Sequence, residues 1–226
     1  MTPFLRGVAQ AMIEAFTPAG PVLEVGSYQV DGQSNLINLR SLFPGQKFIG
    51  LDIREGPGVD QVGSVEKLPF ADESIGCVIA FSAFEHVEHF WHGFEEVHRV
   101  LRPDGVFLVS CPFYFRIHNH PSDYWRFTPE AFDVLLRKYP NRVTGWHGGS
   151  KRPGNVWAAA FKEKALPPTD QQLATYRRVL AEQTKGLPAS PIRKFRYRLG
   201  QLAFGKRPFA GLLEEYDWES RLTKAA

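Results

Sequence analysis

Two apolar stretches decide the fold of this chain: VLEVGS at residues 22–27, which contains an acid and a glycine, and FIGLD at residues 48–52, which ends in an acid. The first places Glu24 and Gly26 at the end of a short buried strand, and the second ends on Asp52. In a parallel α/β sheet, a glycine turn lets the backbone approach a ligand closely. An acid at the end of the next strand can then accept hydrogen bonds from two ribose hydroxyls. The pair therefore predicts a nucleoside-binding α/β domain.

Outward from this core, the residue pattern predicts alternating strands and helices. An amphipathic helix is expected over 4–16, and further helices over 35–43, 90–101 and 129–138. Strands are expected over 22–25, 47–51, 59–62, 75–81 and 106–111, and a final pair over 143–147 and 156–161. The segment RPDG at 102–105 is expected to separate the helix from the fifth strand. This order favours a mostly parallel sheet with helices on both faces.

Length and composition fit a globular chain with an appendage. The composition changes after Lys164, which predicts one domain over 1–164 and a helical, partly basic extension over 165–226, with a helix at 171–182. The net charge of +3 is too small to indicate nucleic-acid binding. Cys77 and Cys111 lie in apolar strands and are expected to be buried thiols in a reducing compartment. With no signal-like segment and no apolar run that could cross a bilayer, we expect a cytoplasmic protein.

Five segments in order resemble the class I S-adenosylmethionine-dependent methyltransferases, in particular their type 11 group. The resemblance covers residues 20–162. It rests on VLEVGS at 22–27, GLD at 50–52, SVEKLPFADES at 64–74, FEHV at 84–87 and EVHRVLRPDG at 96–105. Each segment alone is a weak signal, but five at the proper separations are a strong one.

The resemblance implies a Rossmann-like, doubly wound, mostly parallel seven-stranded sheet with a C-terminal helical extension. It also implies S-adenosyl-L-methionine as cofactor. The residues at the matching positions, which we expect to bind this cofactor, are Glu24, Gly26, Ser27, Gly32, Asp52, Ile53, Ser64, Val65, Phe81 and Ser82.

The chain departs from the family pattern in its first motif. After Gly26, the simplest alignment inserts Tyr28–Asp31 and lets Gly32 serve as the second glycine. Ser64 stands where the family often has an adenine-binding Asp, and a hydroxyl is a weaker acceptor than a carboxylate. A G-x-G-x-x-G dinucleotide fingerprint and a phosphate loop are both absent from the sequence.

Histidines beyond the fourth and fifth strands are the candidate catalytic groups: His86, His118 and His120. Each could act as a general base towards a hydroxyl acceptor, or could merely order its loop. Asp123, Tyr124 and Arg126 are the candidate acceptor contacts, although Arg126 could instead pair with Asp123. We expect His89 and His92 at the surface and Trp125 and Phe127 in the core. Three histidines within 85–92 suggest a metal, but their spacing matches no ligand pattern, so no metal site is expected.

These features predict a methyltransferase that acts on a small-molecule or glycan-type acceptor, most simply at oxygen. Two alternatives stay open: a cofactor-binding scaffold subunit without turnover, and a nucleic-acid methyltransferase. The mild charge argues against the second alternative. The basic, aromatic stretch 192–206 could contact a membrane surface or an anionic partner. Alternatively, a stripe of Phe195, Leu199, Leu202 and Ala203 packs on the domain or on a second subunit. The acceptor and the oligomeric state are not determined by sequence.

Overall fold

The computed structural model describes residues 1–30, 37–148, 153–185, 195, 198–200, 202–203 and 218–224. Its centre is one sheet of eight strands in the order β3-β2-β1-β4-β5-β7-β6-β8. The first five strands in this order are mutually parallel: β3 (Gln61–Val62), β2 (Phe48–Asp52), β1 (Val22–Val25), β4 (Ile75–Phe81) and β5 (Leu101–Pro112). β7 (Asn155–Phe161) runs antiparallel to β5 and β6 (Asn141–His147), and β8 (Trp218–Thr223) runs antiparallel to β6. The predicted Rossmann-like fold is confirmed, with one strand more than predicted.

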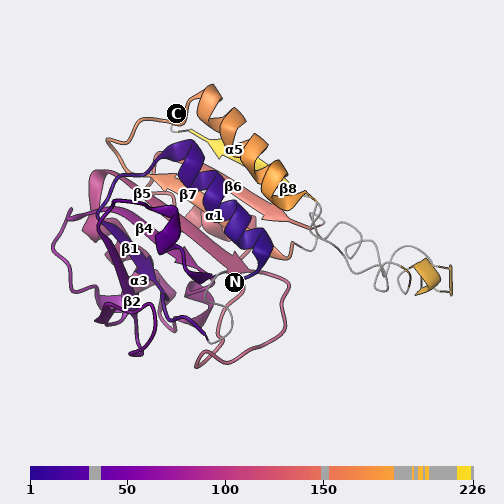
Figure 1. Cartoon of the computed structure of the whole chain (residues 1–226), viewed down its shortest axis with the longest axis horizontal. Helices are drawn as coiled ribbons and strands as arrows, with labels where there is room; N and C mark the ends of the chain where they lie inside the picture. Colours follow the sequence, from indigo (N-terminus) through magenta and orange to yellow (C-terminus); the bar gives the residue numbers. More distant parts are fainter. Residues whose placement is uncertain are drawn as a thin grey trace.

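Helices cover both faces of this sheet. α1 (Pro3–Phe16) and α5 (Asp170–Thr184) lie side by side on one face, and α3 (Phe90–Val100) lies on the other (Figure 1). α4 (Pro129–Leu135) joins α3 in the second core through Phe132. Three short 3-10 helices, η1 (Arg40–Leu42), η2 (Val65–Lys67) and η3 (Phe84–His86), follow strands or loops.

The alternation of side chains along each strand divides the core into two layers. On β4, Cys77 and Ile79 face the α1–α5 layer, whereas Val78 and Ala80 face the α3 layer. All seven β4 residues are buried, as expected of a strand covered on both faces. Both cysteines are free and buried, as predicted.

Several predicted boundaries shift. The helix expected over 35–43 is represented by η1 at its end, and residues 31–36 lie outside the described part of the chain. The segment 102–105 belongs to β5. Ile75 of β4 pairs with Leu101 and Cys77 pairs with Val106, so the segment 102–105 is where the pairing of the two strands changes register. The break therefore interrupts the pairing and not the strand. The α4 helix ends at Leu135, earlier than predicted.

The C-terminal part differs most from the expectation. Residues 218–223 form the edge strand β8 and not a helix. Arg221 explains part of its position, since its guanidinium pairs with Asp133 of α4 and lies 5.5 Å from the centre of the Trp146 ring. Phe195, Leu199 and Leu202 are exposed, so these residues do not pack on the domain; their packing on a second subunit stays a prediction. The rest of the basic stretch 192–206 lies outside the described residues, apart from 198, 200 and 203.

No helix in the described part of the chain combines the length and apolar character needed to span a bilayer.

Candidate functional site

A pocket of about 710 Å³ lies at the carboxyl ends of β1, β2, β4 and β5, where open α/β sheets bind their ligands. This volume is in the usual range for small-molecule sites. The predicted residues that line it are Glu24, Gly26, Ser27, Asp52, Ile53, Ser64, Val65, Phe81, Ser82, His86, His118, His120 and Tyr124. The structure thus brings together thirteen of the sixteen candidates. Asp123 and Arg126 are absent from the wall, and Gly32 lies outside the described residues.

The turn after β1 requires its glycine. Gly26 has a φ of +78°, and a Cβ atom there would lie 2.9 Å from the Cβ of Ala83. Its amide donates to the Leu51 carbonyl oxygen at 2.9 Å, which ties the turn to the end of β2. A side chain at this position would be strained by φ and by contact, so the backbone can approach a ligand here only because the residue is glycine.

Asp52 at the end of β2 is held by two backbone amides. Its Oδ2 accepts from Tyr28 N at 3.2 Å and its Oδ1 accepts from Arg54 N at 3.1 Å. Each carboxylate oxygen can accept a second hydrogen bond, so both can still serve vicinal ribose hydroxyls. The two amide bonds fix the carboxylate in the orientation that such a contact needs.

The inserted segment after Gly26 forms part of the wall, which the sequence did not predict. The Arg54 guanidinium lies 4.3 Å from the centre of the Tyr28 ring, and Gln29 N donates to the Pro57 carbonyl oxygen at 2.8 Å. Tyr28 and Val30 line the pocket. Residues 28–30 of the insertion therefore fold onto the loop after β2 and line the pocket.

Glu24 is buried beneath the turn. Burial raises the pKa of Glu24 to about 8, the nearby Asp52 and Asp60 carboxylates reinforce the rise, and Arg40 opposes it. A protonated carboxyl group in this place would ionise readily beside a ligand cation, because an opposite charge favours the charged form.

Ser64 and Val65 form the opposite wall with η2. The Ser64 Oγ accepts from Glu66 N at 3.1 Å, so this hydroxyl caps the short helix. It is thereby oriented by the helix start and can still donate to a ligand. Val65 is buried and presents an apolar surface to the pocket.

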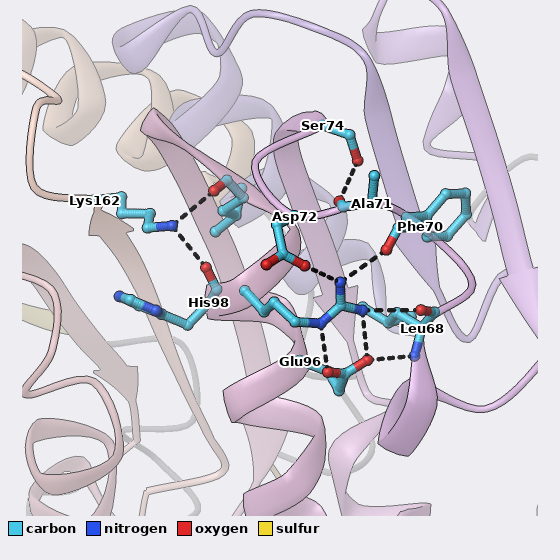
Figure 2. Close-up of polar contacts among 10 residues, drawn as sticks. Leu68, Phe70, Ala71, Asp72, Ser74, Glu96, His98 and Lys162 are labelled. Atoms are coloured by element: carbon cyan, nitrogen blue, oxygen red, sulfur yellow. Dashed lines mark hydrogen bonds and ion pairs between the residues drawn. The ribbon is translucent and has the colours of Figure 1, made fainter.

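Arg99 of α3 fastens the segment that follows this wall. Figure 2 shows its partners Leu68, Phe70, Asp72 and Glu96. Its guanidinium donates to the carbonyl oxygens of Leu68 at 3.0 Å and Phe70 at 2.9 Å. The same group binds Glu96 and Asp72, and Glu96 also accepts from Leu68 N at 2.7 Å. The segment after η2 is thus held by one cation with several partners.

Three imidazoles meet in the wall of the pocket. His86 comes from η3, and His118 and His120 come from the loop after β5; the ring centroids lie 4.8 Å (His86–His118), 5.9 Å (His86–His120) and 5.7 Å (His118–His120) apart. The His86 Nδ1 lies 2.5 Å from the Ser122 carbonyl oxygen. Because a carbonyl oxygen only accepts, Nδ1 carries the hydrogen and Nε2 of the neutral ring has a free lone pair. Burial lowers the pKa of His86, which favours this neutral form.

Asp123 and Arg126 lie behind the wall and bind each other. The Asp123 side chain is 1% exposed and forms an ion pair with Arg126. Arg126 also donates to the Arg116 carbonyl oxygen at 3.3 Å, and Asp123 Oδ2 accepts from His118 N at 2.9 Å. The Arg126 guanidinium holds the pKa of Asp123 far below its usual range. This pair orders the loop; a contact of either side chain with an acceptor stays a prediction, as it does for Tyr124.

Glu85 is a residue of the site that the sequence analysis did not single out. Its side chain is 1% exposed, and within the described structure neither carboxylate oxygen accepts a hydrogen bond of full geometry. Its Oε1 lies 3.9 Å from the His86 Nε2. Burial raises the pKa of Glu85 to about 8. The signal available in the sequence was an acid directly before His86, after a buried strand.

Comparisons with known proteins agree with this geometry. Residues 28–109 match the family model described as a methyltransferase domain. A probable S-adenosylmethionine-dependent methyltransferase of Mycolicibacterium smegmatis is 39% identical over 77 residues, which is 30% of this chain and 30% of that protein. A malonyl-[acyl-carrier protein] O-methyltransferase of Methylococcus capsulatus is 31% identical over 122 residues, 46% of this chain and 43% of that protein. The chain thus spans less than half the length of these relatives.

A solved structure shows the same fold. The 1,6-didemethyltoxoflavin-N1-methyltransferase of Burkholderia thailandensis, with its bound substrate and S-adenosylhomocysteine, has a TM-score of 0.52 to this chain at 18% identity. The match covers 70% of this chain and 78% of that one. Over residues 28–109 the chain is thus similar to the class I S-adenosylmethionine-dependent methyltransferases of the type 11 group.

S-adenosylmethionine is the cofactor of this methyltransferase domain. The pocket fits it: Gly26 provides a close backbone approach, and Asp52 offers a fixed carboxylate for the ribose. The contacts of individual residues with the cofactor stay predictions.

Proposed function

We propose that this chain transfers a methyl group from S-adenosylmethionine to an oxygen atom of a small-molecule or glycan-type acceptor. The observation that carries the proposal is one pocket lined both by Asp52 with the Gly26 turn and by three imidazoles. Methyl transfer is a displacement in which the acceptor oxygen bonds to the methyl carbon while the carbon–sulfur bond breaks and its electrons stay on sulfur. The protein has mainly to align the two reactants.

A hydroxyl acceptor must lose its proton, and His86 is placed to take it. Its Nδ1–H donates to the Ser122 carbonyl oxygen, which leaves the Nε2 lone pair for the acceptor proton. General-base catalysis of this kind contributes about 10²–10⁴-fold to the rate. An acceptor at oxygen is also consistent with the activity named for the malonyl-[acyl-carrier protein] relative.

The rim of the pocket supports a polar, ring-shaped acceptor. Phe115 and Tyr124 line the pocket and are 49% and 47% exposed, so their rings are available for stacking. Polar groups among aromatic ones give orientation and apolar contact together. This combination suits a sugar, whose faces are apolar and whose edge carries hydroxyls.

Calorimetric titration with S-adenosylmethionine and S-adenosylhomocysteine tests the cofactor end. We expect Asp52→Ala to weaken the affinity for both by 10-fold or more, because charge-assisted hydrogen bonds to the ribose are lost; a factor of ten corresponds to about 1.4 kcal/mol. The matched control is Asp104→Ala, an exposed position on β5 outside the pocket, which should leave both dissociation constants unchanged. Equal effects of the two variants would contradict the assignment of Asp52.

Formation of S-adenosylhomocysteine with a panel of sugars and glycan precursors tests the acceptor end. Nuclear magnetic resonance of the product then identifies the methylated atom. A methyl group on nitrogen or carbon would contradict the proposal for oxygen. Cofactor binding without turnover on any acceptor would favour a scaffold subunit.

A further inference from the structure

Around its imidazoles the pocket contains a set of metal-binding atoms, and of these the methyl-transfer proposal uses only the His86 Nε2. One carboxylate oxygen of Glu85, one ring nitrogen of His86 and one ring nitrogen of His118 all lie within 4.8 Å of one another. We propose that these three residues bind a divalent transition-metal ion, with Zn²⁺ as the favoured ion. The sequence spacing did not indicate this site because His118 comes from a loop 32 residues further along the chain.

The state of Glu85 is the strongest argument for a cation. Its side chain is 1% exposed, and neither oxygen accepts a hydrogen bond of full geometry within the described residues; the Cys111 thiol and the residue's own backbone amide contact the carboxyl group. Leaving a buried polar group without a partner costs about 1–3 kcal/mol, and more if the group is charged. Buried carboxylates are ordinarily paired or coordinate a metal. An ion between Glu85 and the two imidazoles would satisfy this group.

The surroundings of the two histidines are those of metal ligands. A metal-bound imidazole usually donates its other N–H to a carbonyl or carboxylate oxygen, which fixes the ring and raises its basicity. His86 Nδ1 lies 2.5 Å from the Ser122 carbonyl oxygen, which leaves Nε2 as its ligand atom. His118 Nδ1 lies 2.9 Å from Asp123 Oδ2, at ion-pair distance but without hydrogen-bond geometry, while the His118 backbone N donates to the same oxygen. The Asp123–Arg126 pair lies behind the wall, where Asp123 is next to His118.

The donor set selects the ion. Two imidazoles and one carboxylate suit Zn²⁺, Co²⁺ or Fe²⁺, whereas Mg²⁺ and Ca²⁺ prefer oxygen ligands throughout. Donors of a tetrahedral zinc site lie about 3.3–3.5 Å apart, given bonds of about 2.0–2.2 Å. The Glu85 Oε1 and His86 Nε2 are 3.9 Å apart, so small side-chain rotations close the site. Three protein ligands leave a coordination position open towards the pocket, as in catalytic zinc sites.

The use of this ion rests on the proposed function, although the site itself does not. An acceptor hydroxyl in the open position would be acidified by the ion, as metal-bound water is. Its proton would pass to His120, which lines the pocket outside the three ligands. The acceptor oxygen then attacks the methyl carbon while the carbon–sulfur bond breaks. When the ion is bound, His86 is one of its ligands, and the ion activates the acceptor hydroxyl in place of His86.

The test is titration of the tag-free, chelator-treated full chain with ZnCl₂ alone, followed by calorimetry, and with CoCl₂, followed by visible absorption. We expect one ion per chain with a micromolar or lower dissociation constant, and an ion-dependent rise in melting temperature. Glu85→Gln and His118→Ala should each weaken binding by 10-fold or more. His89→Ala removes an exposed histidine outside the cluster and should change nothing.

Absence of Zn²⁺ binding, or binding that both ligand variants leave intact, would overturn the inference. If Glu85→Gln does not fold, as judged by circular dichroism, His118→Ala decides. Titration of the metal-free chain with S-adenosylmethionine separates the two proposals. A chain that binds the cofactor but no zinc overturns the metal site alone, and one that binds zinc but no cofactor overturns the proposed function alone.

Discussion

Glu24 shows how a single buried group in the pocket sets the pH dependence of stability. Burial raises its pKa from 4.5 to about 8 in the folded chain. Between these two values the folded state holds the proton and the unfolded state releases it. The free energy of unfolding therefore falls as pH rises through this window, by up to about 1.4 kcal/mol per pH unit from this one group.

Replacing Glu24 by Gln should remove this contribution. We expect the free energy of unfolding of the variant to fall less between pH 5 and pH 8 than that of the unmodified chain, by about 2–4 kcal/mol in total. Urea unfolding at both pH values measures the difference. The control is Glu14→Gln, an exposed glutamate of α1, which should leave the slope unchanged. The same pH slope in Glu24→Gln as in the unmodified chain would show that Glu24 is ionised when folded.

At the scale of elements, α3 is joined to the pocket wall by one side chain. Arg99 binds two backbone carbonyl oxygens and the Asp72 carboxylate in the segment that follows η2, and it also binds Glu96 of its own helix. Lys162, directly after β7, plays a similar part at the end of α3, where its Nζ donates to the carbonyl oxygens of His98 and Leu101, each at 2.8 Å. A cation at a helix C-terminus is favourable because it faces unpaired carbonyl groups.

Arg99→Ala should lower the free energy of unfolding by about 2–3 kcal/mol, since it leaves two carbonyl oxygens and two carboxylates without their donor. Chemical unfolding measures the loss. Arg178→Ala is the matched control, because Arg178 is 60% exposed and pairs with Glu182 on α5. Such an exposed pair contributes about 0.5 kcal/mol or less. Similar losses in the two variants would mean that the bonds of Arg99 contribute little.

Strands whose own residues are apolar could be predicted from the sequence. Strands that form only because a distant segment pairs with them could not. β4 is apolar throughout, and the sequence predicts its bounds to the residue. β8 carries Glu219 and Arg221, has no buried residue, and pairs with β6 some 70 positions earlier in the chain. Nothing local in the sequence marks it as a strand.

The same distinction holds in the pocket. Position at strand ends predicts that His86 and His118 meet, because carboxyl ends of parallel strands share one edge. The direction of a side chain in a loop depends on the fold of that loop. Asp123 therefore faces Arg126 and not the pocket, which the sequence left open.

At the scale of the whole molecule, α1 and α5 close one layer over the sheet together (Figure 1). A Cβ atom on Gly7 would lie 2.9 Å from the Cβ of Gln183, so the two helices are in close contact. Tyr176 of α5 accepts from the Trp157 Nε1 at 2.8 Å and stacks on Phe16 of α1. The predicted division at residue 164 stays a prediction, but α5 shares a core with the domain before it.

If α5 is part of that core, a cavity in α5 should destabilise the whole domain. Leu180 is fully buried in the layer between α5 and α1. We expect Leu180→Ala to lower the free energy of unfolding by about 2–5 kcal/mol, through lost burial and the cavity left behind. Leu166→Ala, at a linker position that is 85% exposed, is the matched control and should change stability by less than about 0.5 kcal/mol.

Urea unfolding should be followed by both tryptophan fluorescence and circular dichroism, because the two probes must shift together if the domain and α5 unfold as one unit. Trp157 lies in the sheet and contacts Tyr176, so its fluorescence reports on the layer that Leu180 helps to form. A Leu180→Ala variant with two separate transitions, the main one unshifted, would show that α5 folds independently. A single shifted transition would show that α5 is an integral part of the domain. The helix that α5 packs against, α1, begins next to the pocket, which Met1 and Thr2 line.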